Sequence, residues 1–500
     1  MLPFQGFIKK AALAVMCLLI VPLASCRALS LNSFRSVDHL QVTDSISAMT
    51  LLNHRIRPAT TVTGKRFLTL EDCRSLALGN NLDLQASRLE ELTQQAIEYS
   101  NRTRILPHFL FSGDLSDKSA LRYSYSDVLG QEGTPVRLFP GTVAPGGVTS
   151  YSTGHERGTW YYVLETRWSP TDAALAYYVT KSSANDIKKS HYQKLRTAQK
   201  LVELVDSSYF RLLAHQETVP LAENLMSIRK AIRQKTGHLL QDRLFKVEDY
   251  YRAEQRAARA KRLLSKIRTD IETERNLLAS AMALSPDSNI DGGFWVDGTL
   301  RRPSFHSEIS ELEMIAVRRR PEAYQAGIAH LNSVNDLKRT IVKYFPRVTG
   351  FWRYARDKDK YLYDKDWKEV GVSIYFDLIE WLANVDESKA TRFKAQKTEK
   401  EISAIALGIT AQVRVAALKY FDGIEELEAA DTSLAGLRRV LQAVETRVSL
   451  QDAEKLMVEE ARADLIEAKI MRMRALGEAN ANLAALQSSM GTNYHESMPH

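Results

Sequence analysis

Cys26 is the residue in this sequence with the clearest chemical context. It follows Leu23-Ala24-Ser25, and small residues at such a point let a signal peptidase approach the backbone. The run looks like a bacterial lipobox, in which the cysteine thiol receives a lipid. Ordinary signal-peptide cleavage needs small residues at the same place, so Cys26 is either a lipid attachment site or a neighbour of a cleavage site. Cys17 lies before this point and Cys73 is then unpaired, so we expect no disulfide and no zinc framework.

Motifs for catalysis are absent from the sequence. It contains no phosphate-binding loop, no HExxH, no GxSxG and no paired CxxC, and the histidines lack the spacing of metal ligands. The charged run 357–360, followed by Tyr361 and Tyr363, fits an external loop with interfacial tyrosines better than an ion site. Gly141–Gly147 is expected to be a loop, because no strand-to-helix context supports a phosphate cradle. We predict no catalytic residues, no metal and no cofactor, hence no enzyme.

The N-terminus predicts export. Lys9 and Lys10 precede an apolar run, 11–24, of about 14 residues, which is too short to span a bilayer. We assign 1–25 to a signal peptide and 26–66 to a lipidated tether. The net charge of +8 does not indicate nucleic-acid binding, because basic and acidic residues alternate along the predicted helical faces.

The remaining chain contains an internal repeat. A helix near 69–83 is followed by Pro107 and an aromatic segment, and a helix near 311–322 is followed by Pro346 and a similar segment. The two prolines share an offset of about 239 residues with Ala77 and Ala316. The repeats are assigned to 67–290 and 291–490, and 491–500 to a disordered tail.

A β-hairpin is predicted in each repeat, at about 106–168 and about 345–377. Side chains alternate with period two over 160–168 and 370–377, and the partner strands are placed at about 106–113 and 345–354. Strands of about 9–10 residues are long enough to cross a bilayer when tilted. Soluble hairpins with one buried face are the competing interpretation.

A very long helix should follow each hairpin. Residues 171–235 contain one proline, Pro220, which should kink the helix or end a segment, and 379–447 contain none. The first helix should turn back near 234–241, where Gly237 can adopt the left-handed conformation that ends a helix. The second should turn near 447–453, and returning helices should end near residues 284 and 490.

This order of elements resembles the TolC-like outer-membrane factors over about 67–490. The matching features are Leu68–Glu71 with Ala77, the run 80–83, the Leu106-Pro107 exit, and Arg233 with Gly237. The resemblance implies a mainly α fold with a small β part. It combines a long α-helical hairpin barrel with four transmembrane strands per chain, which make a 12-stranded barrel in a homotrimer. Four strands alone would leave open edges in hydrocarbon.

The resemblance also implies the function. The chain would be a passive exit duct of a tripartite efflux or type I secretion system, lipid-anchored in the bacterial outer membrane with most of its mass in the periplasm. Its partners would be a periplasmic adaptor and an inner-membrane pump. The turns would dock the adaptor through Arg233, Gly237, Arg447 and Gln451. Carboxylates near the second turn would form the tunnel gate: Asp452, Glu454, Glu459 and Glu460. The family has a glycine where this chain has Gln451, and its paired aspartates are replaced or shifted.

Two other classes remain open. A non-conducting envelope scaffold could use the long helical hairpins alone, although it gives no reason for strand pairs of bilayer length. A general diffusion porin fits poorly, because it needs no helices of about 100 Å. The exported cargo is not indicated by the sequence.

Overall fold

The computed structural model describes residues 67–119, 124–125, 128–129, 135–136, 151–152, 156, 158–241, 246–284, 294–305, 307–447 and 452–494. The chain divides into Met1–Thr60 and Thr61–His500, and all described residues belong to the second unit. The predicted signal peptide, Cys26 and the tether lie outside the described residues.

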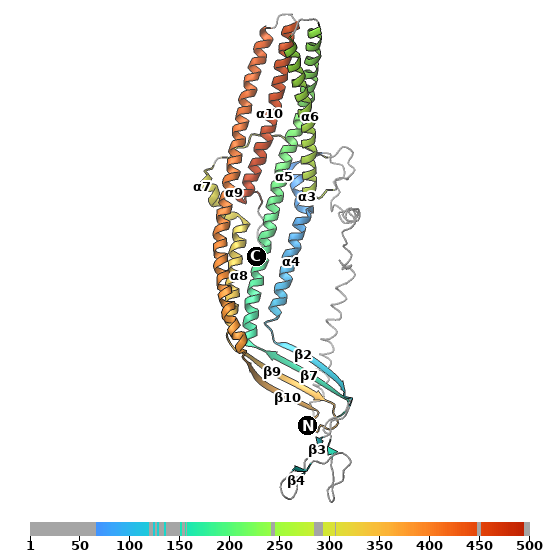
Figure 1. The fold of residues 1–500 in the computed structure, drawn as a ribbon, viewed down its shortest axis with the longest axis vertical. Coiled ribbons are helices and arrows are strands. Elements are labelled where there is room, and N and C mark those ends of the chain that lie inside the picture. Colours follow the sequence, from blue (N-terminus) through green and yellow to red (C-terminus); the bar gives the residue numbers. More distant parts are fainter. Residues whose placement is uncertain are drawn as a thin grey trace. The chain divides into compact units, whose positions relative to one another are not determined.

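Helices make up most of the described chain (Figure 1). Their bounds are α3 Leu70–Asn80, α4 Leu82–Thr103, α5 Pro170–Gln241, α6 Val247–Ala281, α7 Ile309–Arg319, α8 Pro321–Val342, α9 Leu378–Arg447 and α10 Asp452–Met490. With 72 and 70 residues, α5 and α9 are each about 105–110 Å long at 1.5 Å per residue. The two long helices and both returning helices follow the sequence prediction.

Four long strands form one antiparallel sheet in the order β10-β9-β7-β2. They are β2 His108–Asp117, β7 Gly158–Trp168, β9 Arg347–Asp357 and β10 Asp366–Tyr375. Each lies on a segment expected to be a strand. Two short pairs between β2 and β7, in a region predicted to be a loop, are β3 Ser124–Tyr125 with β6 Tyr151–Ser152 and β4 Val128–Leu129 with β5 Pro135–Val136. Finally, β1 Phe67–Leu68 pairs in parallel with β8 Trp295–Val296.

The first helix of each half is followed directly by a second one. Thr69 caps α3 in a capping box with Asp72, and the side chain of Asn81 then accepts from the Leu84 amide at 3.1 Å to start α4. In the second half Pro321 begins α8, and Arg320 before it is extended, as the residue before a proline prefers. The order helix, helix, strand, strand, long helix, returning helix therefore occurs twice; a superposable two-fold repeat stays a prediction.

The first turn was predicted too early in the chain. Helix α5 runs through Pro220 and Gly237 and ends at Gln241. Among the described glycines only Gly491 has a positive φ, so Gly237 is an ordinary helical residue. A Cβ there would lie 3.4 Å from the Tyr250 ring, so the glycine lets α6 approach closely. Because α5 packs against other helices along much of its length, tertiary contacts outweigh these local signals.

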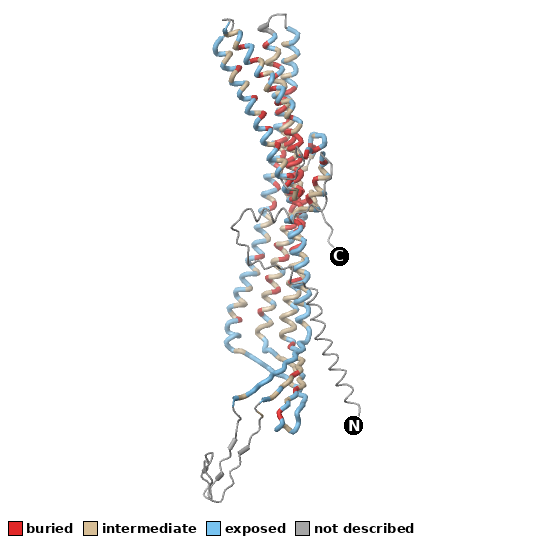
Figure 2. Tube along the Cα trace, turned by 90° about the vertical axis from the view of Figure 1, so that its right-hand side faces the viewer, coloured by how far each residue is buried: buried red, intermediate tan, exposed pale blue. Residues whose placement is uncertain are grey.

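The helices lie side by side with α5 in the middle (Figure 1). Helices α3, α4 and α6 contact α5, and so do α8 and α10, while α9 contacts α7, α8 and α10. Buried residues gather in the middle of the helical region (Figure 2). The main core joins α3, α5 and α6, with Val205, Leu212, Ile267 and Leu278 fully enclosed.

The chain after α10 is ordered further than predicted. Residues 491–494, assigned above to a disordered tail, dock on α5. The Gln199 side chain donates to the carbonyl groups of Gly491 at 3.2 Å and Tyr494 at 3.3 Å, and the Asn493 side chain donates to the Gln199 carbonyl at 2.7 Å. These contacts hold residues 491–494 in place.

Candidate functional site

One face of the four-stranded sheet is apolar and aromatic. The strand register aligns Phe109, Thr166, Trp352 and Val370 across the sheet, and the next row on this face is Phe111, Leu164, Tyr354 and Lys368. The apolar members on β2 and β10 are largely exposed, including Phe109, Val370, Val372 and Ile374. A contiguous exposed apolar face is typical of a surface that a partner or a membrane covers.

The opposite face is polar at its centre. Arg353 donates to Glu165 at 3.0 and 3.2 Å and to Glu369 at 3.1 Å. The Phe351 ring lies over Gly371, where a Cβ would come within 2.5 Å of the ring, and the Arg353 guanidinium lies 5.4 Å from that ring's centre. The sheet therefore has one apolar face and one face with paired charges.

The sheet has two free edges. Strand β2 pairs only with β7, and β10 pairs only with β9, among the strands that the structure describes. Backbone groups along an open strand edge need partners, and in hydrocarbon they have no water to supply them.

The helices have two edges as well. Helices α4 and α6 lie along one side of α5, and α9 lies at the opposite border (Figure 1). Although α5 and α9 are nearly equal in length, 23 residues of α5 are buried and only 9 of α9. Helix α9 is therefore a border helix covered from one side.

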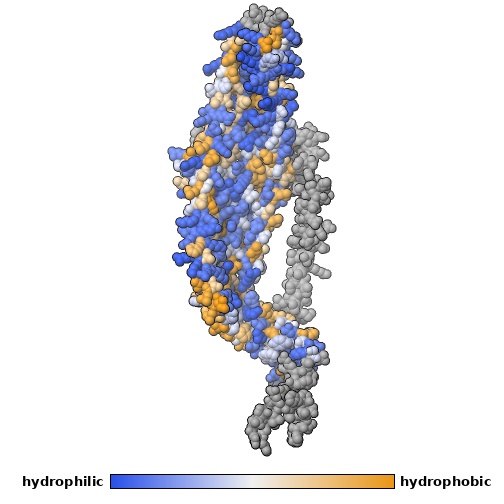
Figure 3. Space-filling view, viewed as in Figure 1, coloured by the Kyte–Doolittle hydropathy of each residue, from blue (hydrophilic) through white to orange (hydrophobic). Residues whose placement is uncertain are grey.

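Exposed apolar residues follow both borders. On α4 they are Leu82, Leu89, Leu92, Ile97 and Tyr99, and on α9 they include Phe393, Leu407, Val415 and Leu418. Apolar surface also gathers where the helices meet the sheet (Figure 3), where Leu378, Ile379 and Leu382 are exposed. Of the described helices, α9 alone is long and apolar enough to cross a membrane by length and composition, with 17% of its most apolar window buried.

Ion pairs hold α10 to its neighbours near the turns. Glu459 pairs with Lys235 of α5, and Glu460 lies 2.6 Å from Arg256 of α6. A little further along, Asp464 pairs with the buried Arg229 of α5. The carboxylates of Glu459 and Glu460 are thus neutralised within the chain.

The other predicted site residues are placed as follows. Asp452 starts α10 and Glu454 lies in its first turn, with side chains outside the described set, as is the whole of Gln451. Arg447 ends α9. Arg233 and Gly237 lie inside α5, and the Arg233 guanidinium is 3.8 Å from Glu254 of α6. Of the four predicted acids, Glu459 pairs with a basic residue of α5 and Glu460 with one of α6.

Three solved structures show which known fold this is. No family model and no curated protein sequence matches the chain. The Campylobacter jejuni outer-membrane channel CmeC is 13% identical with a TM-score of 0.66, covering 86% of this chain and 87% of CmeC. The outer-membrane channel OprN is 16% identical with a TM-score of 0.65, covering 85% and 90%. The Vibrio cholerae outer-membrane protein VceC is 12% identical with a TM-score of 0.63, covering 84% and 96%.

The chain has the TolC-like fold of these outer-membrane channels. At 12–16% identity the likeness lies in the fold, and individual side chains have to be interpreted from this chain's own contacts.

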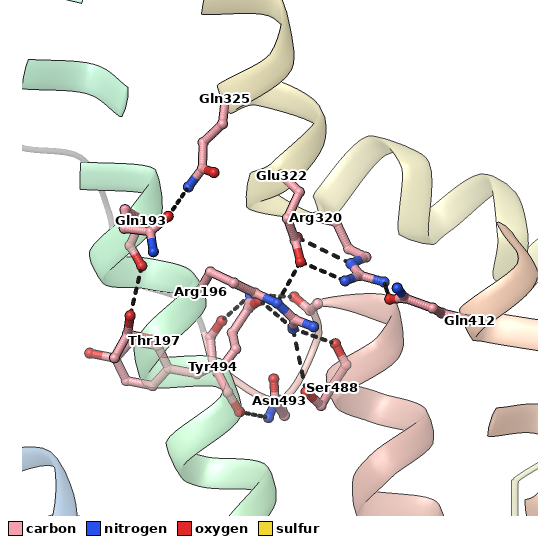
Figure 4. A network of polar contacts seen from close by, with 12 residues as sticks. Gln193, Arg196, Thr197, Arg320, Glu322, Gln325, Gln412, Ser488, Asn493 and Tyr494 are labelled. Atoms are coloured by element: carbon pink, nitrogen blue, oxygen red, sulfur yellow. Dashed lines mark hydrogen bonds and ion pairs between the residues drawn. The ribbon is translucent and has the colours of Figure 1, made fainter. Parts of the chain in front are cut away.

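A cluster of polar contacts around Arg196 and Glu322 in this TolC-like chain was not predicted from the sequence (Figure 4). Arg196 of α5 lies 2.6 Å from Glu322 of α8, and Arg320 donates to the same carboxylate at 2.5 and 3.2 Å and to Gln412 at 2.6 Å. Arg196 also donates to the Ser488 carbonyl at 3.2 Å. The two guanidinium groups lower the pKa of Glu322 against the effect of its burial. Four segments that are distant in the sequence meet here: α5, the corner between α7 and α8, α9 and α10. The proline after Arg320 was the one local sign of this corner.

A second, partly buried charge cluster joins α5, α6 and α10. Arg211 makes a bidentate pair with Glu478 at 2.8 and 3.0 Å, which lowers the pKa of that carboxyl. Burial lowers the pKa of His215 nearby and raises that of Glu274. Among the described residues no group of acids, histidines or cysteines has the arrangement of a metal site. The Arg211–Glu478 pair joins α5 to α10, and its charged groups are engaged with each other.

Proposed function

We propose that the chain is one subunit of an outer-membrane exit duct in a tripartite efflux or type I secretion system. It acts as a passive conduit across the periplasm and outer membrane, without catalysis, cofactor or metal. The observation that carries the proposal is the four-stranded sheet with an apolar face and two free edges, continuous with helices about 105–110 Å long.

The strands have the length that this role requires. They contain 10, 11, 11 and 10 residues, and a tilted strand needs about 9–11 to cross the hydrocarbon core. Pairing β2 of one copy with β10 of the next would satisfy both edges. Three copies would then close a 12-stranded barrel with its apolar face toward lipid.

The helical borders support the same assembly. A head-to-tail contact between α4 of one copy and α9 of the next would cover both apolar stripes, and such a contact closes into a ring when the rotation allows it. A homotrimer is the ring that also closes the sheet.

The gate and the partners belong to the same proposal. Asp452, Glu454, Glu459 and Glu460 are proposed to constrict the tunnel near the second turn. Because Glu459 and Glu460 are paired with Lys235 and Arg256, they would act there as members of ion pairs rather than as free carboxylates. An adaptor linked to an inner-membrane pump would dock at the turns that follow Gln241 and Arg447. Lipidation of Cys26 would hold the N-terminus at the outer membrane.

The alternative is a non-conducting envelope scaffold built from the same helices. It accounts for the helical hairpins but gives no role to an apolar sheet face with two open edges. The domain division at about residue 290 and the twofold repeat fit either function.

The test is single-channel conductance of the purified, cross-linked protein in planar bilayers. We expect small, stable steps from a trimer, which increase when Glu459→Gln and Glu460→Gln loosen the contacts of α10. As a matched control, Glu428→Gln removes an exposed acid that pairs with Arg302 away from the turns. A monomer, or a trimer that shows no conductance even with Glu459→Gln and Glu460→Gln, would leave the scaffold as the function.

A further inference from the structure

We propose that a basic band on α6, made of Arg259, Lys261, Arg262 and Lys266, docks an acidic α-helical segment of a partner protein. The inference rests on the proposed ring of three copies. It identifies the partner that binds the periplasmic half of this ring as an acidic helix. The predicted docking turns are a different surface, because this band lies along the side of the helix.

The band is basic over four turns of α6. Residues 255–269 contain six Lys and Arg residues and no acid. Arg256 pairs with Glu460, and Arg268 pairs with Glu223 at 2.8 Å. The four band residues are exposed and make no ion pair with the residues that the structure describes.

Nearby acids are already engaged. Glu254, before the band, lies 3.8 Å from Arg233, and Asp270, after it, lies 3.7 Å from Arg474. The positive charge of the band is therefore not neutralised by its own subunit.

The shape of the surface suits a helix. A shallow hollow of about 650 Å³ on α6 is lined by Ala258, Lys261, Arg262, Ser265, Lys266, Thr269 and Asp270. Ala258 and Ser265 are seven residues apart, the repeat that places side chains on one seam of a packed helix pair. Small residues on such a seam let a second helix approach closely, and the flanking cations would meet carboxylates on either side of its contact face.

In the proposed ring, a second copy of the chain does not place an acidic helix beside the band. Helix α10 contacts both α6 and α9, so its ion pairs show which of their residues lie at the same height along the helix axes. Residue 256 of α6 lies at the height of residue 445 of α9, and residue 270 lies at the height of residue 431. The contacts that establish this are Arg256–Glu460, Arg462–Glu445, Asp270–Arg474 and Arg472–Asp431.

Rotation about an axis along the helices keeps these heights, so α6 of one copy would face residues 431–445 of the next copy's α9. That segment exposes Arg438 and Arg439. Like charges then meet across the border, which disfavours tight closure. An acidic helix between the two borders would neutralise both.

The probe for the experiment is a stapled helical peptide of about 20 residues, long enough to stay helical. It carries alanines along one seam and glutamates on both sides. Its affinity for the full-length protein in detergent would be measured by fluorescence anisotropy against Lys261→Gln/Arg262→Gln/Lys266→Gln. The control is Lys181→Gln/Lys188→Gln/Lys189→Gln, which removes three exposed lysines of α5.

We expect about tenfold weaker binding to the band variant, since three exposed ion pairs at roughly 0.5 kcal/mol each correspond to about a factor of ten. The control should bind as the wild type does, and higher salt should weaken wild-type binding. The inference is overturned if the band variant binds equally well. It is also overturned if a glutamate-rich coil of equal charge, or vesicles containing phosphatidylglycerol, bind the band as strongly as the helix does.

Oligomeric state and conductance of the same variants separate the two proposals. A conducting trimer whose helix binding does not depend on the band would refute the docking surface and leave the duct intact. Band-dependent helix binding by a chain that never forms a trimer would refute the duct.

Discussion

Substitution of the two border leucines should break the proposed ring without unfolding the subunit. Leu89 of α4 is 63% exposed and Leu407 of α9 is 71% exposed. Full burial of a leucine contributes about 1.5–3 kcal/mol, so covering either side chain in the ring would contribute roughly 1–2 kcal/mol per interface. Three interfaces give about 3–6 kcal/mol, a factor of roughly 10² to 10⁴ in the assembly equilibrium.

The two leucines also lie at about the same height along the helices. The contacts that link the helices at this level are Glu91 with His191, Gln193 with Gln325, and Arg320 with Gln412. Rotation would bring α4 of one copy beside α9 of the next at this height. We therefore expect Leu89→Glu and Leu407→Lys each to dissociate the trimer, and the double variant to recover part of it through a new ion pair, as a double-mutant cycle would measure.

The assay is sedimentation of the protein in detergent, with circular dichroism as the check that each subunit stays helical. Met471→Lys is the control, because Met471 is 45% exposed on α10, which lies between α5 and α9. Trimers of wild-type stability in both leucine variants would refute the border contact. So would equal dissociation by Met471→Lys, which would point to a general effect of added charge.

Three further predictions concern the subunit itself. A Cβ at Gly477 would lie 2.5 Å from the Cβ of Ala214, so Gly477→Val should cost about 1–3 kcal/mol of stability and lower the melting temperature, whereas Gly436→Val, with open space around it, should not. Burial raises the pKa of Cys73 to about 12, so its thiol should resist alkylation at pH 8 until denaturant unfolds a chain whose other two cysteines are replaced. Arg74 holds Asp206 through two bonds of 2.7 Å, and Arg74→Met should weaken the docking of α3 by about 2–3 kcal/mol at pH 7, measured by hydrogen exchange. Burial raises the pKa of Asp206, so protonation relieves the buried charge and the loss should shrink as the pH falls; a loss that grows toward acid would contradict this assignment.

Side-chain periodicity and the spacing of proline and glycine were enough to predict the four long strands, the two long helices and the two returning helices, but not α4, α8 or the short strand pairs. The four strands and both long helices follow from side-chain spacing and from the scarcity of proline and glycine. The prediction of a turn at Gly237 was wrong because a local signal was given more weight than packing. Helix α5 has partners on both sides at this point, and Gly237 makes room for Tyr250. A single sequence shows that a glycine is present and does not show which ring will lie against it.

The polar sites were beyond prediction for a different reason. Arg196, Glu322, Gln412 and Ser488 come from four helices separated by up to 292 positions in the sequence, and no spacing rule connects them. Likewise, the pairing of Glu459 with Lys235 depends on the height at which α10 returns along α5. The family resemblance implied gate carboxylates near the second turn, and the fold brings a cation to each of the two whose side chains the structure describes.

Helix α9 poses a problem that one subunit does not solve. It is nearly as long as α5 yet has fewer than half as many buried residues, and its most apolar window is 17% buried. A border of this kind exposed to water would promote association with any apolar surface. The open strands β2 and β10 have the same difficulty at the end of the chain's sheet. A ring of copies related by rotation would cover the exposed side of α9 and pair the open strands β2 and β10. The space that the ring encloses is the proposed conduit. Stability of the assembly and conduction should therefore be lost together in border variants, while variants of the α6 band should lose partner binding alone.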